Sequence, residues 1–257
     1  MKCINCHQTM KYFFSKKGFH IYRCDECKLM SVENVPEDLS PYYAEGYFTG
    51  DVTLDGYMDY ENDKEVTRKT YETYLDEIAK RLGKREQIAM FEVGCATGFF
   101  LERAKARGWN VAGIDLSEYA IKKAKEKGLK AEAASLDTYA TNDKYDVIVM
   151  YDLIEHVKNP VETLRRASEM LKPEGLMVIT TPDAGSLWAR VWGEKWHAFV
   201  PPQHLFYFRV SHLKNMLTKQ GLETVQVSHH GKWFAIPYII RLLYSWTGLT
   251  LFSRLAR

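Results

Sequence analysis

A short glycine-containing loop is the feature that most restricts what this chain can fold into. The segment 91–99 reads FEVGCATGF, and it joins an apolar run that predicts a strand to a pattern that predicts a helix. Glycines at such a turn let the backbone approach a bound ligand closely. The spacing Gly94, Ala96, Gly98 is shorter than the G-x-G-x-x-G fingerprint of dinucleotide-binding proteins. The loop therefore lacks a pyrophosphate cradle of the expected length.

Strand and helix patterns alternate along the chain from residue 87 onward. The apolar runs predict strands over 88–93, 111–114, 129–134, 145–150, 176–180 and 222–228. The helical patterns lie over 99–107, 117–127, 159–171 and 211–220, with Ser117 and Ser211 as N-caps and Pro160 at a first helical position. Repeated βα units predict an α/β fold with a mostly parallel, doubly wound sheet, and ligands then sit outside the carboxyl ends of its strands.

Asp115 stands at the end of the second predicted strand, downstream of the glycine loop. An acidic side chain at this place can accept hydrogen bonds from both hydroxyls of a ribose. The loop and the acid together predict a site for a ribose-containing ligand at the carboxyl edge of the sheet.

Four of the five cysteines form two C-x2-C pairs near the start of the chain. Their spacing fits the zinc pattern C-x2-C-x15–20-C-x2-C, in which two tight turns complete a tetrahedron of thiolates. The first pair, followed by His7, also matches a c-type haem attachment site, and either pair could be a redox motif. The second pair, the absence of an export signal and the absence of a nearby βαβ pattern argue against both. We expect a closed, structural zinc site formed by Cys3, Cys6, Cys24 and Cys27.

A tyrosine-rich connector follows the cysteine segment. Residues 36–60 are rich in Tyr, Gly and Asp, which predicts loop and turn rather than regular structure. Its tyrosines could contact a ligand, but we expect them to pack the cysteine module onto the main domain. Residues 61–82 fit an amphipathic helix that ends at Gly83.

Charge and hydropathy exclude some classes of protein. The net charge of +2 over 257 residues is too small to indicate a nucleic-acid-binding protein. The first residues lack the apolar core of a secretory signal, so we expect a cytoplasmic location. The tail over 231–257 is basic and apolar and carries no acidic residue, which suits peripheral contact with anionic lipid or a lipid-linked acceptor. A helical lid or a dimer contact is the alternative, and it is the interpretation that we favour.

The motifs resemble those of a known family. FEVGCATGFFL, followed by GIDLS, and the segment YDVIVMYDLIEHVKNPVETLRRASEMLKPEGLMVITTP are similar to the small-molecule branch of the class I S-adenosylmethionine-dependent methyltransferases. The whole chain resembles bacterial methyltransferases with an N-terminal cysteine module, including some sugar C-methyltransferases. The resemblance implies a Rossmann-like doubly wound sheet with a small zinc ribbon-like module. It divides the chain into a zinc module (1–35), a connector and helix (36–86), a cofactor domain (87–230) with an acceptor-side insertion (183–210), and a tail (231–257).

The resemblance also assigns cofactor contacts residue by residue. It implies that Glu92, Gly94, Cys95 and Gly98 lie at the methionine part of S-adenosylmethionine and that Asp115 binds the ribose. It further implies contacts to the adenine from Leu116, Ser135, Leu136 and Asp137, and a position beside the methyl donor for Tyr151 and Asp152. A plain tight turn could explain any one glycine, but not the loop, the acid and their spacing together.

Methyl transfer is a displacement on a sulfonium, so the protein supplies alignment and, where needed, a base. The Glu-His pair that ends in His156 resembles that of related O- and C-methyltransferases, and His204 lies where the family lines its acceptor pocket. We expect His156 to be the base before His204, although each could simply brace its loop; His212 receives no role. Similarity to quinone-biosynthesis O-methyltransferases offers Asp152, Glu155 and His156 as Mg²⁺ ligands, which we rank below the histidine base.

Three functions compete at this point. The first is methyl transfer to a small molecule, which could be a sugar, a lipid-linked compound or a secondary metabolite. The second is RNA methylation with the zinc module binding RNA, against which stand the small net charge and the absence of an NPPY-type motif after the fourth strand. The third is a non-catalytic module that binds cofactor or zinc. The family also leads us to expect a seventh strand, which the chain lacks unless it is truncated or the tail replaces it.

Overall fold

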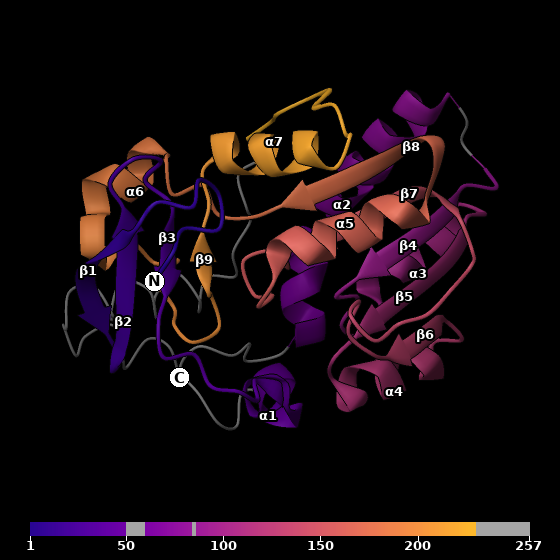
Figure 1. The fold of residues 1–257 in the computed structure, drawn as a ribbon. Coiled ribbons are helices and arrows are strands. Elements are labelled where there is room, and N and C mark those ends of the chain that lie inside the picture. Colours follow the sequence, from indigo (N-terminus) through magenta and orange to yellow (C-terminus); the bar gives the residue numbers. More distant parts are fainter. Residues whose placement is uncertain (50–59, 84–85, 230–257) are drawn as a thin grey trace.

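The computed structural model describes residues 1–49, 60–83 and 86–229, which form two sheets (Figure 1). A five-stranded sheet has the order β6-β5-β4-β7-β8, and a four-stranded sheet has the order β1-β2-β3-β9. All strand pairs of the larger sheet are parallel, and those of the smaller sheet are antiparallel.

The larger sheet contains β4 (Ala89–Val93), β5 (Asn110–Asp115), β6 (Lys130–Ala133), β7 (Tyr145–Tyr151) and β8 (Leu171–Thr180). β4 pairs with β5 on one side and with β7 on the other, so the strand order reverses at β4. The crevice of a doubly wound sheet opens at such a reversal, outside the carboxyl ends of the strands. The Rossmann-like fold expected from the sequence is confirmed, as are its first five strands.

Helices cover both faces of this sheet because its strands are buried on both sides. On one face Met90 and Val147 pack with α2 (Tyr60–Leu82), α3 (Phe99–Ala106) and α4 (Glu118–Glu126). On the other face Phe91 and Ile148 pack with α5 (Pro160–Met170) and α7 (Val210–Lys219). Ser117 caps α4 through Ala120 N, and Pro160 begins α5, both as the sequence predicts.

The smaller sheet joins the start of the chain to a distant segment. β1 (Met10–Lys16), β2 (Phe19–Cys24) and β3 (Met30–Val32) form a meander, and β9 (Phe206–Tyr207) adds to the edge of β3. The short helices α6 (Leu187–Trp192) and η2 (Gly193–Lys195) lie in the segment that leads to β9. Trp196, Phe199 and Tyr207 from that segment share a buried core with the sheet.

Three local predictions are wrong. Residues 222–228 form no strand, because Val225 and Val227 stay exposed and strand propensity acts only where side chains find a half-buried neighbouring surface. α7 begins at Val210 with Arg209 as its N-cap, so Ser211 lies inside the helix. The connector contains the short helices η1 (Ser40–Tyr43) and α1 (Glu45–Thr49), where buried Phe48 packs against Tyr60 and Tyr119.

Within the described residues, no helix is long and apolar enough to cross a membrane. The tail over 231–257, with its expected lipid, lid or dimer contact and the question of a seventh strand, lies outside the described residues.

Candidate active site

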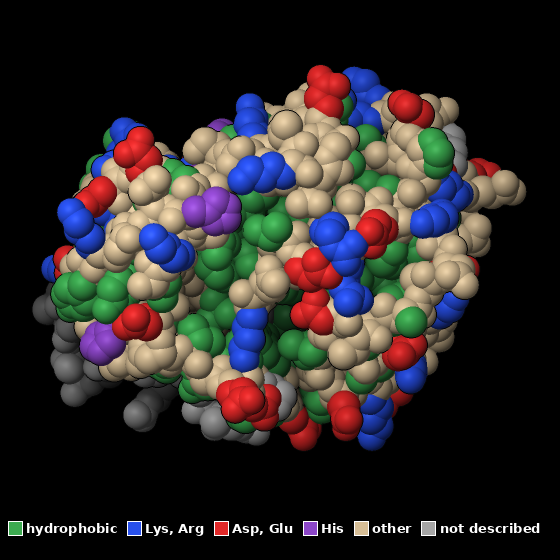
Figure 2. Space-filling model, viewed as in Figure 1, with side chains coloured by type: hydrophobic (Ala, Val, Ile, Leu, Met, Phe, Trp, Pro, Cys, Tyr) green, Lys and Arg blue, Asp and Glu red, His purple; other side chains and the backbone are tan. Residues whose placement is uncertain are grey.

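A cavity of about 640 Å³ opens at the carboxyl ends of the parallel strands, a volume suited to a small-molecule ligand. Its walls come from the larger sheet and the loops after its strands, from α2, from the connector and from the segment 197–204 that leads to β9. In Figure 2 hydrophobic side chains gather in the hollow between the two sheet regions. Ten of the residues expected at the site line the cavity: Gly94, Asp115, Leu116, Ser135, Leu136, Asp137, Tyr151, Asp152, His156 and His204. His197 lines it as well.

The glycine loop is tied to the end of β5. Gly94 N and Cys95 N both donate to the carbonyl of Ile114, at 2.8 and 2.9 Å. The carboxylate of Asp115 accepts from Ala96 N through one oxygen and from Ser117 N through the other, each at 2.9 Å. Gly94 and Ala96 adopt positive φ angles of 77° and 47°. Asp115 therefore holds the loop in place, and it also faces the cavity.

Three residues expected at the cofactor lie just behind the cavity wall. Gly98 has a φ of 79° and packs against α4, where an added Cβ would lie 2.3 Å from Leu129 Cδ1. The side chain of Cys95 is buried in the core beneath the loop. Glu92 is buried too, and its Oε2 has no hydrogen-bond partner within the described part of the chain. Burial raises the pKa of Glu92 to about 8.

Aromatic side chains of α2 form one wall of the cavity. Tyr151 at the end of β7 stacks on Tyr71 and Tyr74, with ring centroids 5.6 and 5.1 Å apart. The sequence predicts both α2 tyrosines only as core positions of an amphipathic helix. Burial raises the pKa of Tyr151 well above its ordinary value, so its hydroxyl stays protonated.

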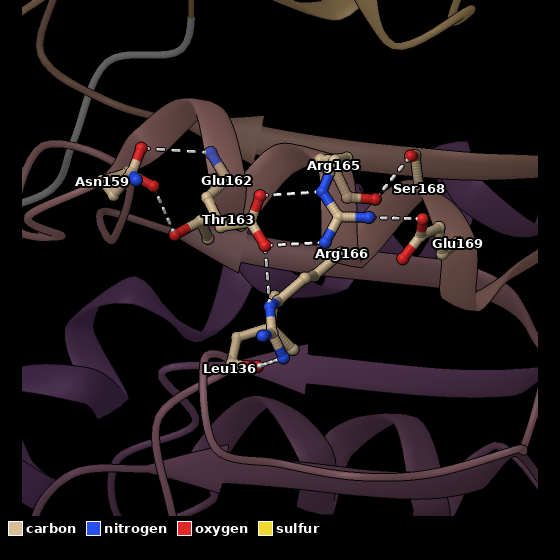
Figure 3. A network of polar contacts seen from close by, with 8 residues as sticks. All are labelled: Leu136, Asn159, Glu162, Thr163, Arg165, Arg166, Ser168 and Glu169. Carbon is tan, nitrogen blue, oxygen red and sulfur yellow. Dashed lines mark hydrogen bonds and ion pairs between the residues drawn. The ribbon is translucent and has the colours of Figure 1, made fainter.

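A loop on the opposite side of the cavity is anchored by a charged network on α5 (Figure 3). Glu162 accepts hydrogen bonds from Arg165 and Arg166, and these contacts lower its pKa to about 2. Arg166 Nη1 also donates to the carbonyl of Leu136 at 3.3 Å. The network therefore positions the loop after β6, which carries the expected adenine contacts.

Two of the histidines that line the cavity are in contact with each other. The rings of His156 and His204 are 4.7 Å apart and nearly perpendicular. Tyr43 Oη lies 2.9 Å from His156 Nδ1, and Glu155 Oε1 lies 4.0 Å from His156 Nε2. The sequence indicates the two histidines, but Tyr43 is distinguished there only as one of several connector tyrosines.

The structure brings together two of the three residues offered as Mg²⁺ ligands. Glu155, His156 and His204 place ligand atoms within 4.8 Å of one another, whereas Asp152 is not in this group. Asp152 Oδ1 instead accepts from Thr180 Oγ1 at 3.3 Å. His204, rather than Asp152, completes the cluster of potential ligands.

The four N-terminal cysteines converge as a zinc site requires. Their sulfurs lie within 4.8 Å of one another, with three Sγ–Sγ distances of 3.5–3.6 Å. Zn–S bonds of about 2.3 Å in a tetrahedron place sulfurs about 3.8 Å apart. The two turns are alike, since His7 N donates to Cys3 O and Lys28 N donates to Cys24 O. The donor set and its geometry both fit a structural zinc ion.

Comparisons with known proteins agree with this arrangement. A family model described as a methyltransferase domain matches residues 66–227. A ubiquinone biosynthesis O-methyltransferase from Marinobacter nauticus is 33% identical over 118 residues, which cover 42% of this chain and 48% of that protein. One from Azoarcus sp. is 30% identical over 153 residues, covering 54% and 66%. This chain spans about half the length of the curated relatives that it matches first.

Solved structures share the fold at low sequence identity. The magnesium protoporphyrin IX methyltransferase from Synechocystis, with bound S-adenosylhomocysteine, has a TM-score of 0.58 at 13% identity, covering 77% of this chain and 91% of that one. A possible histamine N-methyltransferase from Thermotoga maritima has a TM-score of 0.52 at 22% identity, covering 64% and 76%.

Proposed function

The chain belongs to the methyltransferase-domain family, and from that premise we propose that it transfers a methyl group from S-adenosylmethionine to a small-molecule acceptor. One observation carries the proposal: a single cavity is lined by Gly94 and Asp115 from the glycine loop and β5 and by the contacting pair His156 and His204. Such a cavity can align a methyl donor with a nucleophile and provide a base beside it.

The residues around the glycine loop fit S-adenosylmethionine, which supplies an electrophilic methyl group when bound. Asp115 faces the cavity, and each of its oxygens can accept a further hydrogen bond from a ribose hydroxyl. Leu116 is exposed and flanks the place for the adenine. The unpartnered Oε2 of Glu92 can receive a donor from the amino end of the cofactor, directly or through water.

His156 is the proposed general base. When Nδ1 carries its hydrogen and donates to Tyr43 Oη, Nε2 carries the lone pair that takes a proton from the acceptor. The nearby carboxyl group of Glu155 then stabilises the imidazolium that forms. His204, in contact with the His156 ring, lines the acceptor side and is the second candidate for the base.

The acceptor belongs, in this proposal, to the sugar-type, lipid-linked or secondary-metabolite small molecules. The relatives named for ubiquinone biosynthesis support a small molecule rather than RNA. The four cysteines hold a structural zinc ion. The cluster of Glu155, His156 and His204 offers one carboxylate and two histidine nitrogens, whereas Mg²⁺ is bound mainly by oxygen ligands, so we expect activity that does not need magnesium.

A labelled-methyl screen tests the proposal. The full chain is incubated with isotope-labelled S-adenosylmethionine and pooled metabolites, and His156→Ala is compared with the wild type and with His229→Ala, an exposed histidine remote in sequence from the site. We expect His156→Ala to keep S-adenosylhomocysteine binding and to lose about 10²–10⁴-fold in rate. Equal amounts of labelled product from the wild type and from His156→Ala would refute the assignment of His156 as the general base.

Two further arms of the screen separate the alternatives. EDTA treatment that leaves the zinc in place is expected to leave the rate unchanged, and a loss restored by Mg²⁺ would favour the magnesium site. When RNA is offered in place of the metabolites, labelling of the RNA that falls steeply with rising salt would favour RNA as the substrate. If calorimetry detects no binding of S-adenosylmethionine to the chain, only the non-catalytic function remains.

A further inference from the structure

We propose that the cysteine module is a working part of the acceptor side: its strand β3 positions His204 by pairing with β9. The inference rests on the proposed function, since it assigns a support to a histidine of the reaction site. It predicts that loss of the zinc site disorders the acceptor end of the cavity and spares the cofactor end.

The first observation is the pairing itself. β9 is antiparallel to β3, with Met30 opposite Tyr207 and Ser31 opposite Phe206. Val32 N also donates to the carbonyl of Leu205 at 2.9 Å. Leu205 directly follows His204 in the chain, so the edge of the module ends one residue from the histidine in the cavity.

The second observation is that the same segment binds the other half of the site. Leu205 N and Phe206 N both donate to the carbonyl of Glu155, at 2.8 and 3.2 Å. Glu155 is almost fully buried and precedes His156. Residues 205–206 are therefore bonded to β3 on one side and to the Glu155–His156 backbone on the other, which brings the two histidine rings together.

The third observation is that the metal-binding turns are attached to α7. The Nε2 hydrogen of buried His212 donates to the carbonyl of Cys27 at 2.7 Å, while its Nδ1 accepts from Arg209 N at 3.0 Å. Asn215 Nδ2 donates to Asn5 Oδ1 at 2.9 Å. Each cysteine pair thus has a direct bond to the helix that follows β9.

Aromatic packing makes this contact stiff. The ring of Phe14 lies 4.9 Å from that of Phe199, and Phe199 lies 4.6 Å from Tyr207. Tyr207 is fully buried. Residues before and after His204 are therefore packed into the core of the module, and the histidine cannot keep its position if that core loosens.

The cofactor end is held by different contacts. Gly94 N and Cys95 N bond to β5, and the Asp115 carboxylate bonds to the loop itself. These bonds lie within the larger sheet, so they do not pass through the cysteine module. Perturbing the module should therefore loosen the acceptor end of the cavity and leave the cofactor end unchanged.

Hydrogen–deuterium exchange of the full chain tests the inference without a known acceptor. Zinc-loaded protein is compared with chelator-treated protein and with Val32→Pro, which removes the N–H that bonds to Leu205 and touches no cysteine. Tyr12→Ala, at an exposed position of β1, is the control. We expect peptides covering 204–207 to exchange at least about tenfold faster after zinc removal and in Val32→Pro, and peptides covering β4 to be unchanged.

S-adenosylhomocysteine binding provides the second readout. Its Kd should stay within about twofold of wild type in Val32→Pro, whose zinc content should be normal. Unchanged exchange over 204–207 in zinc-free protein would overturn the inference, and so would equal loss of protection in both sheets. If the wild type binds S-adenosylhomocysteine but methylates no acceptor, the proposed function fails. The exchange result still decides whether the cysteine module positions His204.

Discussion

Replacing Gly98 with alanine should destabilise the fold far more than the same change at Gly108, although both residues have nearly the same backbone. Their φ angles are 79° and 78°. An added Cβ at Gly98 would lie 2.3 Å from Leu129 Cδ1 and 3.2 Å from Ala124 Cβ. At Gly108 it would meet nothing within 4 Å. The pair thus separates the cost of backbone strain from the cost of a steric clash.

The magnitudes follow from these two terms. A non-glycine residue in the left-handed region costs about 1–2 kcal/mol, and this term applies to both variants. Overpacking a closed core costs about 1–3 kcal/mol, and it applies only at Gly98, because Leu129 is buried and α4 lies behind it. We therefore expect Gly98→Ala to lose about 2–5 kcal/mol and Gly108→Ala about 1–2 kcal/mol.

Urea unfolding measures the difference. Both variants and the wild type are unfolded at one pH, zinc-loaded and without cofactor, and the midpoints and slopes are compared. Thermal melting should agree, at about 2–4 °C per kcal/mol for a chain of this size. Free energies of unfolding that agree to within about 0.5 kcal/mol between the two variants would show that Leu129 yields without cost, and the close-packing argument would be wrong.

Three further predictions concern the cofactor and metal sites. Asp115→Ala should weaken S-adenosylhomocysteine binding by at least about tenfold in calorimetry, because it removes the acceptor of Ala96 N and Ser117 N as well as the ribose contact; unchanged affinity would exclude that role. The raised pKa of Glu92, about 8 against 4.5, means that the folded state keeps a proton which the unfolded chain loses. As the pH rises from about 4.5 to 8, the free energy of unfolding of the wild type should therefore fall relative to that of Glu92→Gln, by up to about 1.4 kcal/mol per pH unit. Parallel curves of unfolding free energy against pH would contradict this. Zinc-loaded protein should release one Zn²⁺ per chain on thiol modification, and Cys24→Ser should melt lower and bind less metal; a metal-free wild type of equal stability would contradict the zinc site.

The elements of the larger sheet could be predicted because their signals are local. Apolar runs such as 145–150 are buried on both faces, and Ser117 and Pro160 mark helix starts through contacts within one turn. The glycine loop and Asp115 were predictable for the same reason, since they follow two adjacent strands whose carboxyl ends must meet. The strands are set by burial and the caps by backbone hydrogen bonds, both of which leave a short-range pattern.

Contacts between distant segments leave no such pattern. β9 is only Phe206–Tyr207, too short for a period, and its existence depends on the exposed edge of β3, which comes from the other end of the chain. The residues over 222–228 show the opposite case, with strand-forming side chains that pair with none of the described strands. Strand propensity shows that a segment can form a strand, but whether it does depends on a neighbouring strand that the fold brings beside it.

The candidate site also has one part that local sequence signals predict and one part that depends on contacts between distant segments. Its cofactor end is built almost entirely from one continuous stretch, from β4 to the loop after β7, so its sequence motif and its geometry agree. The acceptor end that we propose combines Tyr43 from the connector, His156 after β7 and His204 beside β9. They are brought together by the contact of Tyr43 with His156, the pairing of β9 with β3 and the bonds from residues 205–206 to Glu155. If the two proposals hold, we expect a chain that kept the cofactor motifs but lost the cysteine module to bind S-adenosylmethionine and to need another support for His204. The identity of the acceptor must therefore be sought in this composite end, where changes in the module and the connector alter the reaction without altering the cofactor motifs.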